Sequence, residues 1–389
     1  MSDKAKKNKL AIFIYSFSNG GAERVMSYLL PYLKKKGREV VLVLMNDKLG
    51  YVIPEDVPVY YIEKSKGDEP GIFKFLKLPW LAWKYARLLK RLHITHSFSL
   101  LTRSCYINIM ARWFTKHSFK LMVSERNYPS LQYGYGDMQG KVNTFLVKKL
   151  YPRADLVISN AKASEEDLVQ NFNVDPTKTK VIYNPIDLKK INAISPIDNF
   201  FDPSFFNTIS VGRLEKVKNQ KLLIHAVKSL DNVRLYILGD GELRQELEKE
   251  ITLNGLEERV FLMGFETNPY KYLKGADLFI FGSNHEGFPN VLLEAMSCGL
   301  PILTTNCKSG PDEIMELNDQ QDNEIMVTPY GILAPVENSH LLQKGLHHFM
   351  QNHDYLRSCK ENVLNRVKVF DKETILNAYE MTLLVENTK

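Results

Sequence analysis

The chain has 389 residues, of which 44% are apolar and 25% charged, and its formal net charge is +6. This length suits two domains, because single cores rarely exceed ~250–300 residues. The sequence predicts no membrane-spanning helix, since uncharged apolar runs stay shorter than ~18 residues. The basic start lacks a small-residue cleavage site, which argues against a signal peptide. Four scattered cysteines without a Cys-x-x-Cys pair favour free thiols in a reducing cytoplasm.

The charge is divided unevenly along the chain. Residues 1–190 hold 32 Lys+Arg and 17 Asp+Glu, a balance of +15, whereas residues 191–389 hold 19 and 28, a balance of −9. A basic half can meet nucleic acid, anionic lipid or a phosphorylated substrate. The sequence contains no recognisable nucleic-acid-binding module, so we expect no nucleic-acid partner.

Strand and helix patterns alternate through both halves. The first half has predicted strands at 10–15, 40–45, 120–124 and 156–159, and the second has them at 208–211, 234–238, 260–263, 278–281 and 302–304. Apolar runs bounded by Gly and Pro and separated by helices indicate parallel sheets covered on both faces. We therefore predict an α/β protein with two doubly wound domains that face each other across a cleft, where ligands bind at strand ends.

The domain boundary is predicted from a stretch of weak periodicity. Several prolines and little regular pattern mark residues 184–206 as a connection. We place a first domain at 1–190 and a second domain at 191–370. The remaining residues, 371–389, form a C-terminal helix that is expected to pack back on the first domain.

A glycine turn follows the first predicted strand. Gly20 and Gly21 let the backbone approach a ligand closely, and the helix that starts there offers free amides to a phosphate. The alternative is a simple tight connection. Glu23 and Arg24 are expected to act mainly as helix-start charges.

Residues 71–92 are the candidate for a membrane contact. The segment carries six cations, no acid and two tryptophans among leucines and phenylalanines. Such a composition suits a helix at headgroup level that does not span the bilayer. The alternative is an amphipathic helix that covers the first sheet. The residues expected to face lipid are Phe73, Lys74, Lys77, Trp80, Trp83, Lys84 and Arg87.

A pair of cations follows the first strand of the second half. Gly212 ends that strand, and Arg213 and Lys218 stand five positions apart in the loop after it. Two positive groups can clamp a diphosphate and stabilise the charge that develops as a nucleoside diphosphate departs. The alternative is a solvated basic loop.

Two glutamates flank the start of another helix in the second half. Glu286 stands before a Gly/Pro-containing turn, the helix begins near Asn290, and Glu294 lies one to two turns into it. Helix starts attract anions, and carboxylates accept hydrogen bonds from hydroxyls, so a diphosphate and a polyol could lie here together. An isolated pair of glutamates would more often simply face water.

The spacing and wording of these two motifs resemble glycosyltransferase family 4, a retaining group with the two-domain GT-B fold. The resemblance covers the run Glu286–Pro301, which contains the E-x7-E pattern, and the GR-x4-K pattern at 212–218. It implies that Glu286 contacts the donor sugar, that Glu294 holds the ribose hydroxyls, and that Arg213 and Lys218 bind the diphosphate. Further donor contacts are implied for Gly20, Gly21, Gly239, Met263, Gly264, Gly287, Phe288, Pro289, Asn290 and Val291.

One position departs from the family pattern. Many members carry a histidine after the central strand of the first domain, close to the transferred sugar, and this chain has Arg126 there. Glu125 or Arg126 could contact the sugar or the acceptor phosphate in its place. His96 is a weaker substitute, because a lone histidine at a strand end is more often structural.

The runs at 9–16, 20–25, 41–47, 73–79 and 264–272 carry a narrower likeness within the family, to enzymes that transfer GalNAc in bacterial protein N-glycosylation. The resemblance implies that the first domain faces the acceptor and the membrane and that the second binds the nucleotide sugar. It implies transfer of an α-linked HexNAc, GalNAc or its uronic acid relative, from a UDP-sugar to an undecaprenyl-diphosphate-linked disaccharide. It also implies a peripheral position at the cytoplasmic face of the inner membrane, with other enzymes of the pathway as candidate partners. No metal or other cofactor is expected. The alternatives are capsule or lipopolysaccharide synthesis and a non-catalytic sugar-nucleotide- or lipid-binding module.

Overall fold

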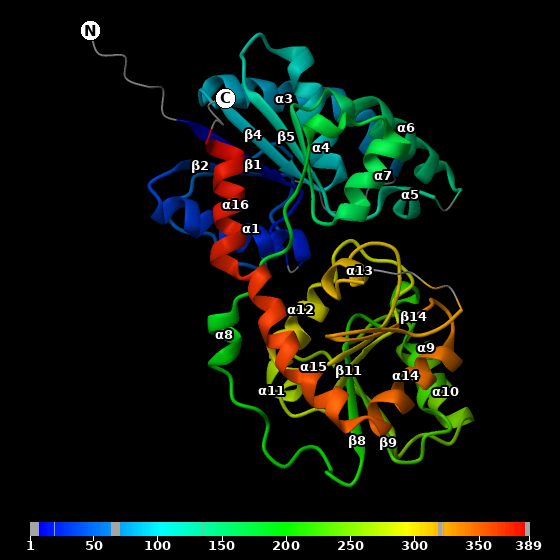
Figure 1. The fold of residues 1–389 in the computed structure, drawn as a ribbon. Helices are drawn as coiled ribbons and strands as arrows, with labels where there is room; N and C mark the ends of the chain where they lie inside the picture. Colours follow the sequence, from blue (N-terminus) through cyan, green and yellow to red (C-terminus); the bar gives the residue numbers. More distant parts are fainter. Residues whose placement is uncertain are drawn as a thin grey trace. The chain divides into compact units, whose positions relative to one another are not determined.

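The chain forms two compact units (Figure 1). A computed structural model describes residues 8–18, 20–63, 71–134, 136–317, 321 and 323–385, without the side chains of residues 71, 72 and 74. The first unit comprises the described residues up to Pro185 together with those from Lys372 onward, and the second comprises Ile186–Asp371. The division falls before the expected boundary at 190 because α8 (Leu188–Asn192) packs on α12 (Asn290–Ser297) of the second unit.

The first unit is built on a seven-stranded parallel sheet with the order β3-β2-β1-β4-β5-β6-β7. The order reverses between β1 and β4, and ligands of doubly wound sheets bind at the carboxyl ends of the strands beside such a reversal. Its strands are β1 (Lys9–Ile14), β2 (Glu39–Leu44), β3 (Val59–Tyr61), β4 (His96–Leu100), β5 (Lys120–Glu125), β6 (Leu156–Ser159) and β7 (Thr179–Val181).

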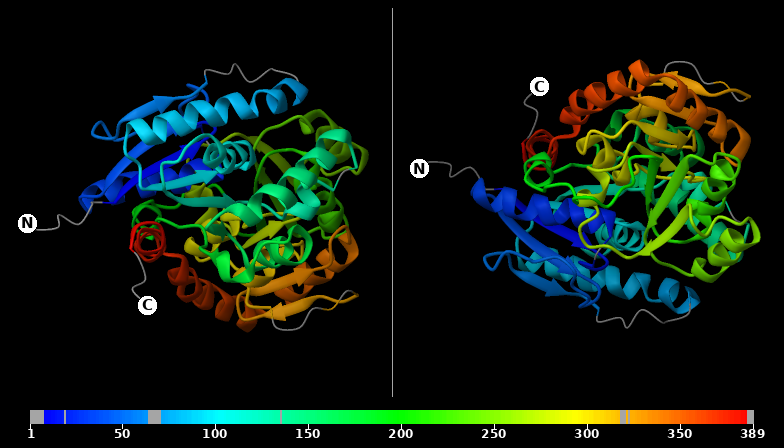
Figure 2. Two further views of the ribbon diagram at one scale, coloured as in Figure 1. Left: turned by 90° about the horizontal axis from the view of Figure 1, so that it is seen from above. Right: turned by 90° about the horizontal axis from the view of Figure 1, so that it is seen from below.

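Helices cover both faces of this sheet. Alternate residues of β1 point to opposite faces, so Ala11 and Phe13 join one core cluster while Ile12 and Ile14 join the other. In Figure 2 the light-blue helix α3 and the red helix α16 lie on opposite sides of the sheet. The helices are α1 (Gly21–Lys35), α2 (Gly71–Leu76), α3 (Leu78–Arg91), α4 (Thr102–Ala111), η1 (Arg112–Phe114), α5 (Pro129–Gln132), α6 (Met138–Leu150), η2 (Tyr151–Arg153), α7 (Lys162–Phe172), η3 (Pro176–Lys178) and α16 (Lys372–Leu384).

The central strand β4 is unusual because it buries hydroxyl groups. Ser97 and Ser99 are completely buried, and a hydrogen-bond network satisfies them. The Ser97 hydroxyl donates to Asn108 Oδ1 at 2.7 Å, and Asn108 Nδ2 donates to the Ser99 hydroxyl at 3.0 Å. Such buried polar groups are tolerated because each has a partner. Apolar runs therefore did not indicate a strand here.

The second unit contains a seven-stranded sheet with the order β10-β9-β8-β11-β12-β14-β13. All pairings are parallel except that between β13 and β14, and the order reverses between β8 and β11. The five strands expected from the sequence are confirmed, and β13 and β14 are additional. The strands are β8 (Phe206–Val211), β9 (Val233–Leu238), β10 (Val260–Gly264), β11 (Leu278–Phe281), β12 (Ile302–Thr305), β13 (Met326–Thr328) and β14 (Gly331–Ala334).

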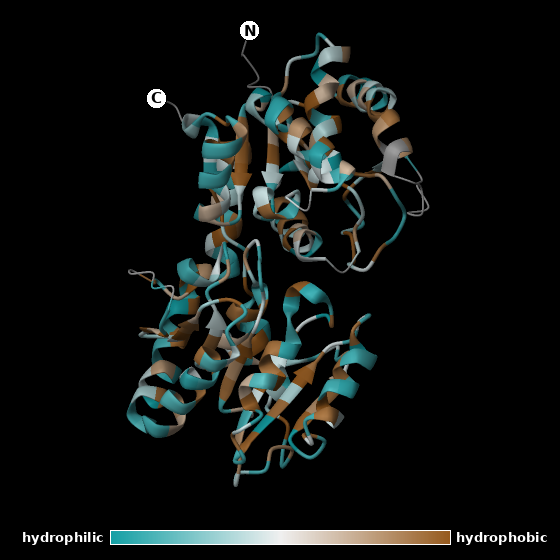
Figure 3. Cartoon of the chain, turned by 90° about the vertical axis from the view of Figure 1, so that its right-hand side faces the viewer, coloured by the Kyte–Doolittle hydropathy of each residue, from teal (hydrophilic) through white to brown (hydrophobic). Residues whose placement is uncertain are grey.

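Apolar residues concentrate on the strands of both units, as the brown segments of Figure 3 show. In the second unit they form a core between the sheet and helices such as α9 and α14. The helices of this unit, besides α8 and α12, are η4 (Lys216–Lys218), α9 (Gln220–Val227), α10 (Arg244–Leu253), α11 (Tyr270–Leu273), α13 (Pro311–Ile314), α14 (Ser339–Gln351), α15 (His353–Arg366) and η5 (Val367–Phe370). Among the described helices, none has the length and apolar character needed to cross a bilayer.

The C-terminal helix α16 belongs to the first unit, although it follows the second along the chain. It packs beside α1, and its buried face places Leu376, Tyr379 and Leu383 in the core on that side of the first sheet. Arg38 Nε donates to the Glu380 carboxylate at 2.7 Å and adds a charged contact to the same packing. The first core is therefore assembled from both ends of the chain.

Candidate functional site

Two loops of the second unit meet at the carboxyl ends of β8 and β11, where the strand order reverses. The loop after β8 leads through η4 to α9, and the loop after β11 leads to α12. Asn284 N donates to the Val217 carbonyl at 2.8 Å, and Asn219 Nδ2 donates to Asn284 Oδ1 at 3.1 Å. The Ser283 hydroxyl also donates to Val217 O, at 3.1 Å. These bonds fix the two loops against each other.

Lys218 and Glu286 form an ion pair between these loops. The distance from Lys218 Nζ to Glu286 Oε1 is 2.5 Å, and the Ser283 hydroxyl donates to the same oxygen at 2.7 Å. The two side chains are only 21% and 12% exposed, so water screens the pair less than it screens a surface pair. The structure thus brings together two residues that are 68 positions apart.

Arg213 occupies a different environment in the same loop. Its side chain is 81% exposed, and Nη1 lies 3.7 Å from Glu215 Oε2. The backbone of Arg213 is held more firmly, because Gln220 Nε2 donates to its carbonyl at 2.8 Å. An exposed pair at this distance contributes little. The loop therefore presents the guanidinium on a fixed backbone with the side chain extended toward solvent.

The turn that leads into α12 is supported from behind by the segment that starts at Ser309. The Ser309 hydroxyl donates to the Gly287 carbonyl at 2.6 Å. Gly310 has a φ of +102°, and a Cβ there would lie 2.5 Å from Pro289 Cδ. Phe288 packs on Phe370 with 5.6 Å between ring centroids. The turn is thereby fixed in place.

Helix α12 begins at Asn290 after Pro289. Its first turn, which includes Val291, offers backbone amides and the positive end of the helix dipole. Glu294 lies one turn further on and is 7% exposed. Glu286 and Glu294 therefore stand on either side of the helix start, as expected from the sequence.

Glycines bring the ends of β8, β9 and β10 together. Gly239 has a φ of +143°, and a Cβ there would lie 1.9 Å from the Gly212 carbonyl oxygen. Gly239 N donates to the Gly264 carbonyl at 2.7 Å. Any side chain at Gly239 would collide with backbone. Met263 precedes Gly264 on β10 and is half-buried at the same sheet edge.

His285 is a neighbour of the ion pair that sequence reasoning did not select. Burial lowers the pKa of its imidazole below the ordinary 6.5, and the nearby Lys218 acts in the same direction, whereas Glu286 opposes the shift. At neutral pH the ring is therefore uncharged. Its position directly before Glu286 was the available signal.

The glycine turn of the first unit encloses a carboxylate. Ser16 and Ser18 donate to Glu23 Oε1 at 3.2 and 3.4 Å, and Glu23 is buried. A Cβ on Gly20 would lie 2.3 Å from Glu23 Oε2. Glu23 thus closes over Gly20 and holds the turn, while Gly21 begins α1.

Glu125 and Arg126 are buried in the first unit and engage protein groups. Glu125 accepts hydrogen bonds from the Arg126 and Asn127 amides at 2.9 and 3.2 Å and from the Tyr151 hydroxyl at 3.1 Å. Burial raises the pKa of the Glu125 carboxyl above 4.5. Arg126 donates to the Tyr379 hydroxyl at 3.0 Å and to Asn184. Contact of either residue with a sugar stays a prediction.

His96 lies at the opposite edge of the first sheet. It opens β4, so it stands at the amino end of the strand, whereas ligands of such sheets bind at the carboxyl ends. Its Nδ1 lies 2.9 Å from the Thr95 hydroxyl. The position favours a structural role.

Helices α2 and α3 carry an exposed apolar stripe, which consists of Phe73, Leu76, Trp80 and Trp83. The spacing of three residues puts Phe73 and Leu76 on one face of α2, and Trp80 and Trp83 on one face of α3. Leu76 belongs to the stripe although it is not among the residues that the sequence predicted to face lipid. Its spacing of three residues from Phe73 was the available signal.

Cations accompany the stripe. Lys84 Nζ lies 4.3 Å from the centre of the Trp80 ring, and the Arg87 guanidinium lies 4.8 Å from that of Trp83. Lys77 instead turns toward the Glu63 carboxylate, at 3.4 Å. The side chain of Lys74 lies outside the described residues.

The opposite face of α3 packs on the first sheet through Leu78, Leu81, Ala82 and Tyr85. The interpretation of this segment as a helix that covers the first sheet is confirmed for this face of α3, and contact of the exposed stripe with lipid stays a prediction.

Among the described residues, no group of three or more His, Cys, Asp or Glu side chains is arranged to hold a metal ion. The four cysteines are free. Burial raises the pKa of Cys105 and of Cys298 to about 12, so both thiols stay protonated near neutral pH. The second unit presents a cation paired with a carboxylate beside a helix start.

Comparison with known proteins finds matches along nearly the whole chain. Residues 19–190 match the model for Glycosyltransferase Family 4, and residues 198–366 match that for Glycosyl transferases group 1. The chain is 42% identical to the N-acetylgalactosamine-N,N'-diacetylbacillosaminyl-diphospho-undecaprenol 4-alpha-N-acetylgalactosaminyltransferase of Campylobacter jejuni, over 94% of this chain and 97% of that protein. It is 32% identical to an uncharacterised glycosyltransferase of Methanocaldococcus jannaschii, over 86% of this chain and 89% of that protein.

Solved structures show the same fold. Anabaena HepE, crystallised with UDP and glucose, aligns over 97% of this chain and 99% of its own with a TM-score of 0.75 and 22% sequence identity. The two sheets, the two matched family models and the full-length relatives all indicate the same family and the same fold. The chain belongs to glycosyltransferase family 4, and it is a sugar-transferring enzyme with the GT-B fold.

Proposed function

We propose that this enzyme transfers an α-linked N-acetylhexosamine, GalNAc or its uronic acid relative, from a UDP-sugar to an undecaprenyl-diphosphate-linked disaccharide. The observation that carries the donor half of this proposal is the Lys218–Glu286 pair at the reversal of the second sheet, with Glu294 one turn into the adjoining helix. The acceptor half is supported by the full-length likeness to the Campylobacter enzyme, whose name states such an acceptor.

In the proposed donor complex, charge holds the diphosphate. Lys218 supplies a cation on a short, fixed loop, and Arg213 can swing from solvent onto the other phosphate. The start of α12 adds backbone amides and a positive dipole end. Glu286 and Glu294 accept hydrogen bonds from sugar and ribose hydroxyls, and charged acceptors make the stronger bonds of this kind.

The same groups stabilise the transition state. The bond between the anomeric carbon and the diphosphate oxygen breaks, and the acceptor oxygen bonds to that carbon. The acceptor hydroxyl proton passes to the departing phosphate, so retention needs no protein nucleophile. Negative charge grows on the diphosphate as it leaves, and a fixed cation stabilises this charge more than it stabilises the bound donor. We further propose that the reaction proceeds without a metal ion.

The apolar stripe is proposed to meet the anionic membrane that carries the acceptor. Trp80 and Trp83 are 52% and 40% exposed, which is unusual for such large apolar rings. Indole rings and long cationic stems suit the headgroup region. A peripheral enzyme held there, at the cytoplasmic face of the inner membrane, would meet a lipid-linked sugar and other enzymes of the same pathway.

The donor panel is the deciding experiment. Purified enzyme is incubated with UDP-GalNAc, UDP-GlcNAc, UDP-GalNAcA or UDP-GlcNAcA and the undecaprenyl-diphosphate disaccharide in anionic vesicles. Product is expected with one donor of this set, with the anomeric configuration retained and turnover unchanged by EDTA. A folded enzyme that yields no product with any of them would overturn the proposal. Loss of turnover in EDTA would overturn only the metal-free reaction.

A further inference from the structure

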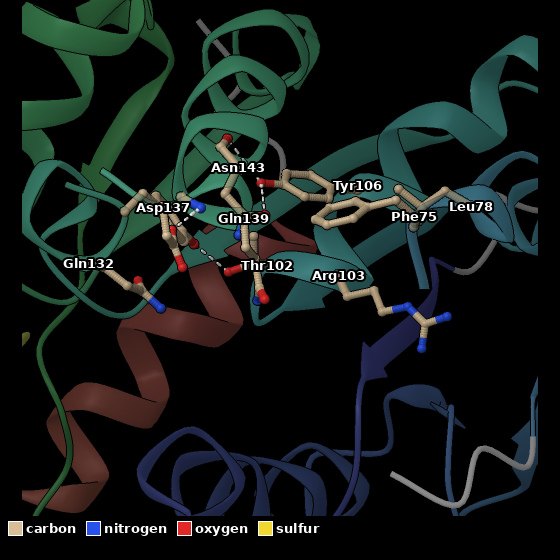
Figure 4. Close-up of a pocket in the computed structure, with 11 residues that line it drawn as sticks. Phe75, Leu78, Thr102, Arg103, Tyr106, Gln132, Asp137, Gln139 and Asn143 are labelled. Carbon is tan, nitrogen blue, oxygen red and sulfur yellow. Dashed lines mark hydrogen bonds between the residues drawn. The ribbon is translucent and has the colours of Figure 1, made fainter. Parts of the chain in front are cut away.

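We propose that a cavity within the first unit binds an acetamido sugar of the lipid-linked acceptor; the inference rests on the function proposed above. The cavity has a volume of about 420 Å³, within the usual range for small-ligand pockets of ~300–1,000 Å³. Figure 4 shows its lining side chains, which come from α2, α3, α4, α5 and α6 and the turn before α6.

The cavity lies at the carboxyl edge of the first sheet. Helix α4 follows directly on β4, and α5 follows closely on β5. The strand order reverses between β1 and β4, so this edge is where doubly wound sheets bind ligands. The glycine turn after β1 lies at the same edge. The cavity is thus placed for a substrate and does not arise from loose packing deep in the core.

One side of the cavity is polar and is held in position by internal hydrogen bonds. The Thr102 and Tyr133 hydroxyls lie 2.5 Å apart, and the Tyr106 hydroxyl donates to Asn143 Oδ1 at 3.2 Å. Asp137 caps α6 by accepting from the Gly140 amide at 2.6 Å. Polar groups fixed in this way can form hydrogen bonds with sugar hydroxyls without losing further conformational entropy on binding.

Gln132 adds an unsatisfied group to this side. Its Oε1 is buried and accepts no hydrogen bond from the part of the chain that the structure describes. A buried acceptor without a donor is unfavourable, because it has lost its hydrogen bonds to water. The N–H of an acetamido group is a donor that a rotation of the Gln132 side chain into the cavity would reach, and the bond would recover part of this cost.

The other side of the cavity is apolar. In Figure 4 the side chains of Phe75, Tyr106 and Leu78 are drawn on one side, those of Gln132 and Asp137 on the other, and Thr102 between them. A pyranose has an apolar C–H face and a rim of hydroxyls, and an acetamido group has a methyl beside its N–H. The two-sided lining matches both features of such a sugar.

The charge of the cavity favours a neutral sugar over a nucleotide. Its lining cation, Arg103, lies 3.1 Å from the Glu63 carboxylate, and Lys77 approaches the same carboxylate at 3.4 Å. A donor diphosphate is better served by the second unit, where Arg213 is 81% exposed and Lys218 stands beside a helix start.

The lining also connects the cavity to the proposed membrane face. Phe75 and Leu78 line the cavity from the same helical segment that exposes Leu76 and Trp80 on its other side. A sugar bound in the cavity would therefore be separated from the membrane-facing stripe only by the thickness of this segment. That is the position expected for a sugar whose diphosphate and polyprenyl chain remain at the membrane.

Acceptor binding can be measured without transfer. The probes are the undecaprenyl-diphosphate disaccharide with two acetamido sugars, in detergent micelles, and the same lipid with hydrogen in place of the acetamido groups. We expect Gln132→Ala to weaken binding of the acetamido probe about tenfold and to leave the deoxy probe, which has no donor at that position, nearly unchanged. Asn143→Ala should weaken both, while UDP binding stays as in the wild type. Gln170→Ala, an exposed amide on α7, is the matched control.

Each outcome decides the proposal. Equal binding by wild type and both cavity variants, with melting temperatures unchanged, would overturn it, as would a loss confined to UDP binding. If a variant is unfolded, Tyr106→Phe replaces it, because this change removes only the hydroxyl that orients Asn143. Failure of the proposed function is distinct: wild-type enzyme would then give no product in the donor panel, whatever the binding results.

Discussion

The two units share a doubly wound sheet but present different chemistry at its carboxyl edge. In the second unit the edge is charged: a lysine and a glutamate pair between two short loops, and a helix start adjoins them. In the first unit the edge opens into a cavity with one polar and one apolar wall, and the neighbouring α2–α3 segment exposes aromatic rings. The difference matches the proposed function, in which the second unit binds a charged donor and the first unit binds an amphiphilic acceptor.

The largest expected effect is on the charged edge. Lys218→Ala should lower kcat/KM by about 10²–10³-fold, because a fixed donor to a developing negative charge is worth ~2.7–4 kcal/mol in the transition state. Steady-state kinetics with the accepted UDP-sugar will measure it. Lys216→Ala, which changes an exposed cation on the same turn, is the control and should stay near wild type. An unchanged rate for Lys218→Ala would remove this residue from the diphosphate site.

The next test concerns the apolar surface. Trp80→Ser with Trp83→Ser should lower partitioning onto anionic liposomes about tenfold, since burying a large apolar side chain is worth ~1.5–3 kcal/mol and about half of each ring is available. Sedimentation with vesicles will measure it. Leu253→Ser, on α10 of the second unit, is the control, because this apolar side chain is even more exposed, at 82%, and lies outside the stripe. Undiminished partitioning of the double variant would show that the stripe does not hold the protein at the membrane.

The smallest expected effect is on pH-dependent stability and concerns Glu125. This carboxyl is buried among neutral hydrogen-bond donors, whereas Glu286 of the second unit is paired with a cation. Because burial raises the pKa of Glu125 above 4.5, the folded state keeps its proton to higher pH than the unfolded chain does. Its contribution to the free energy of unfolding therefore falls as the pH rises from 4.5 toward the folded-state pKa. Glu125→Gln should flatten this part of the stability profile, as measured by urea unfolding at several pH values.

The same variant tests whether Glu125 takes part in catalysis. Its present contacts predict that kcat stays within a few-fold of wild type once stability is accounted for. Glu166→Gln, an exposed change on α7, should leave both the stability profile and turnover as they are. A loss of turnover by orders of magnitude in folded Glu125→Gln would instead make this carboxyl a catalytic residue.

The charged site was the more predictable of the two from sequence. Arg213, Lys218, Glu286 and Glu294 lie in two short motifs, and each motif runs from a strand end into a helix, so local spacing already fixes most of the geometry. The pairing of Lys218 with Glu286 was not predictable, because it depends on β8 and β11 being neighbours in the sheet.

No pattern in the sequence predicted the cavity of the first unit. Its lining residues come from separate helices and share no motif, and only tertiary packing brings Phe75, Thr102 and Gln132 around one space. Strand β4 was not predicted from the sequence, for a related reason. Its buried serines look polar in the sequence, and their partner Asn108 is supplied by the following helix.

The arrangement of α16 has a consequence for how the chain is made. The helix completes the core of the first unit, yet its residues are synthesised after the whole of the second unit. Domains generally fold as units during synthesis, with N-terminal ones first. Here the second unit can finish its core while the ribosome is still at work, but the first must wait with the binding surface for Leu376, Tyr379 and Leu383 uncovered. The enzyme is in effect one domain inserted into another, and its last helix closes the structure that its first strand began.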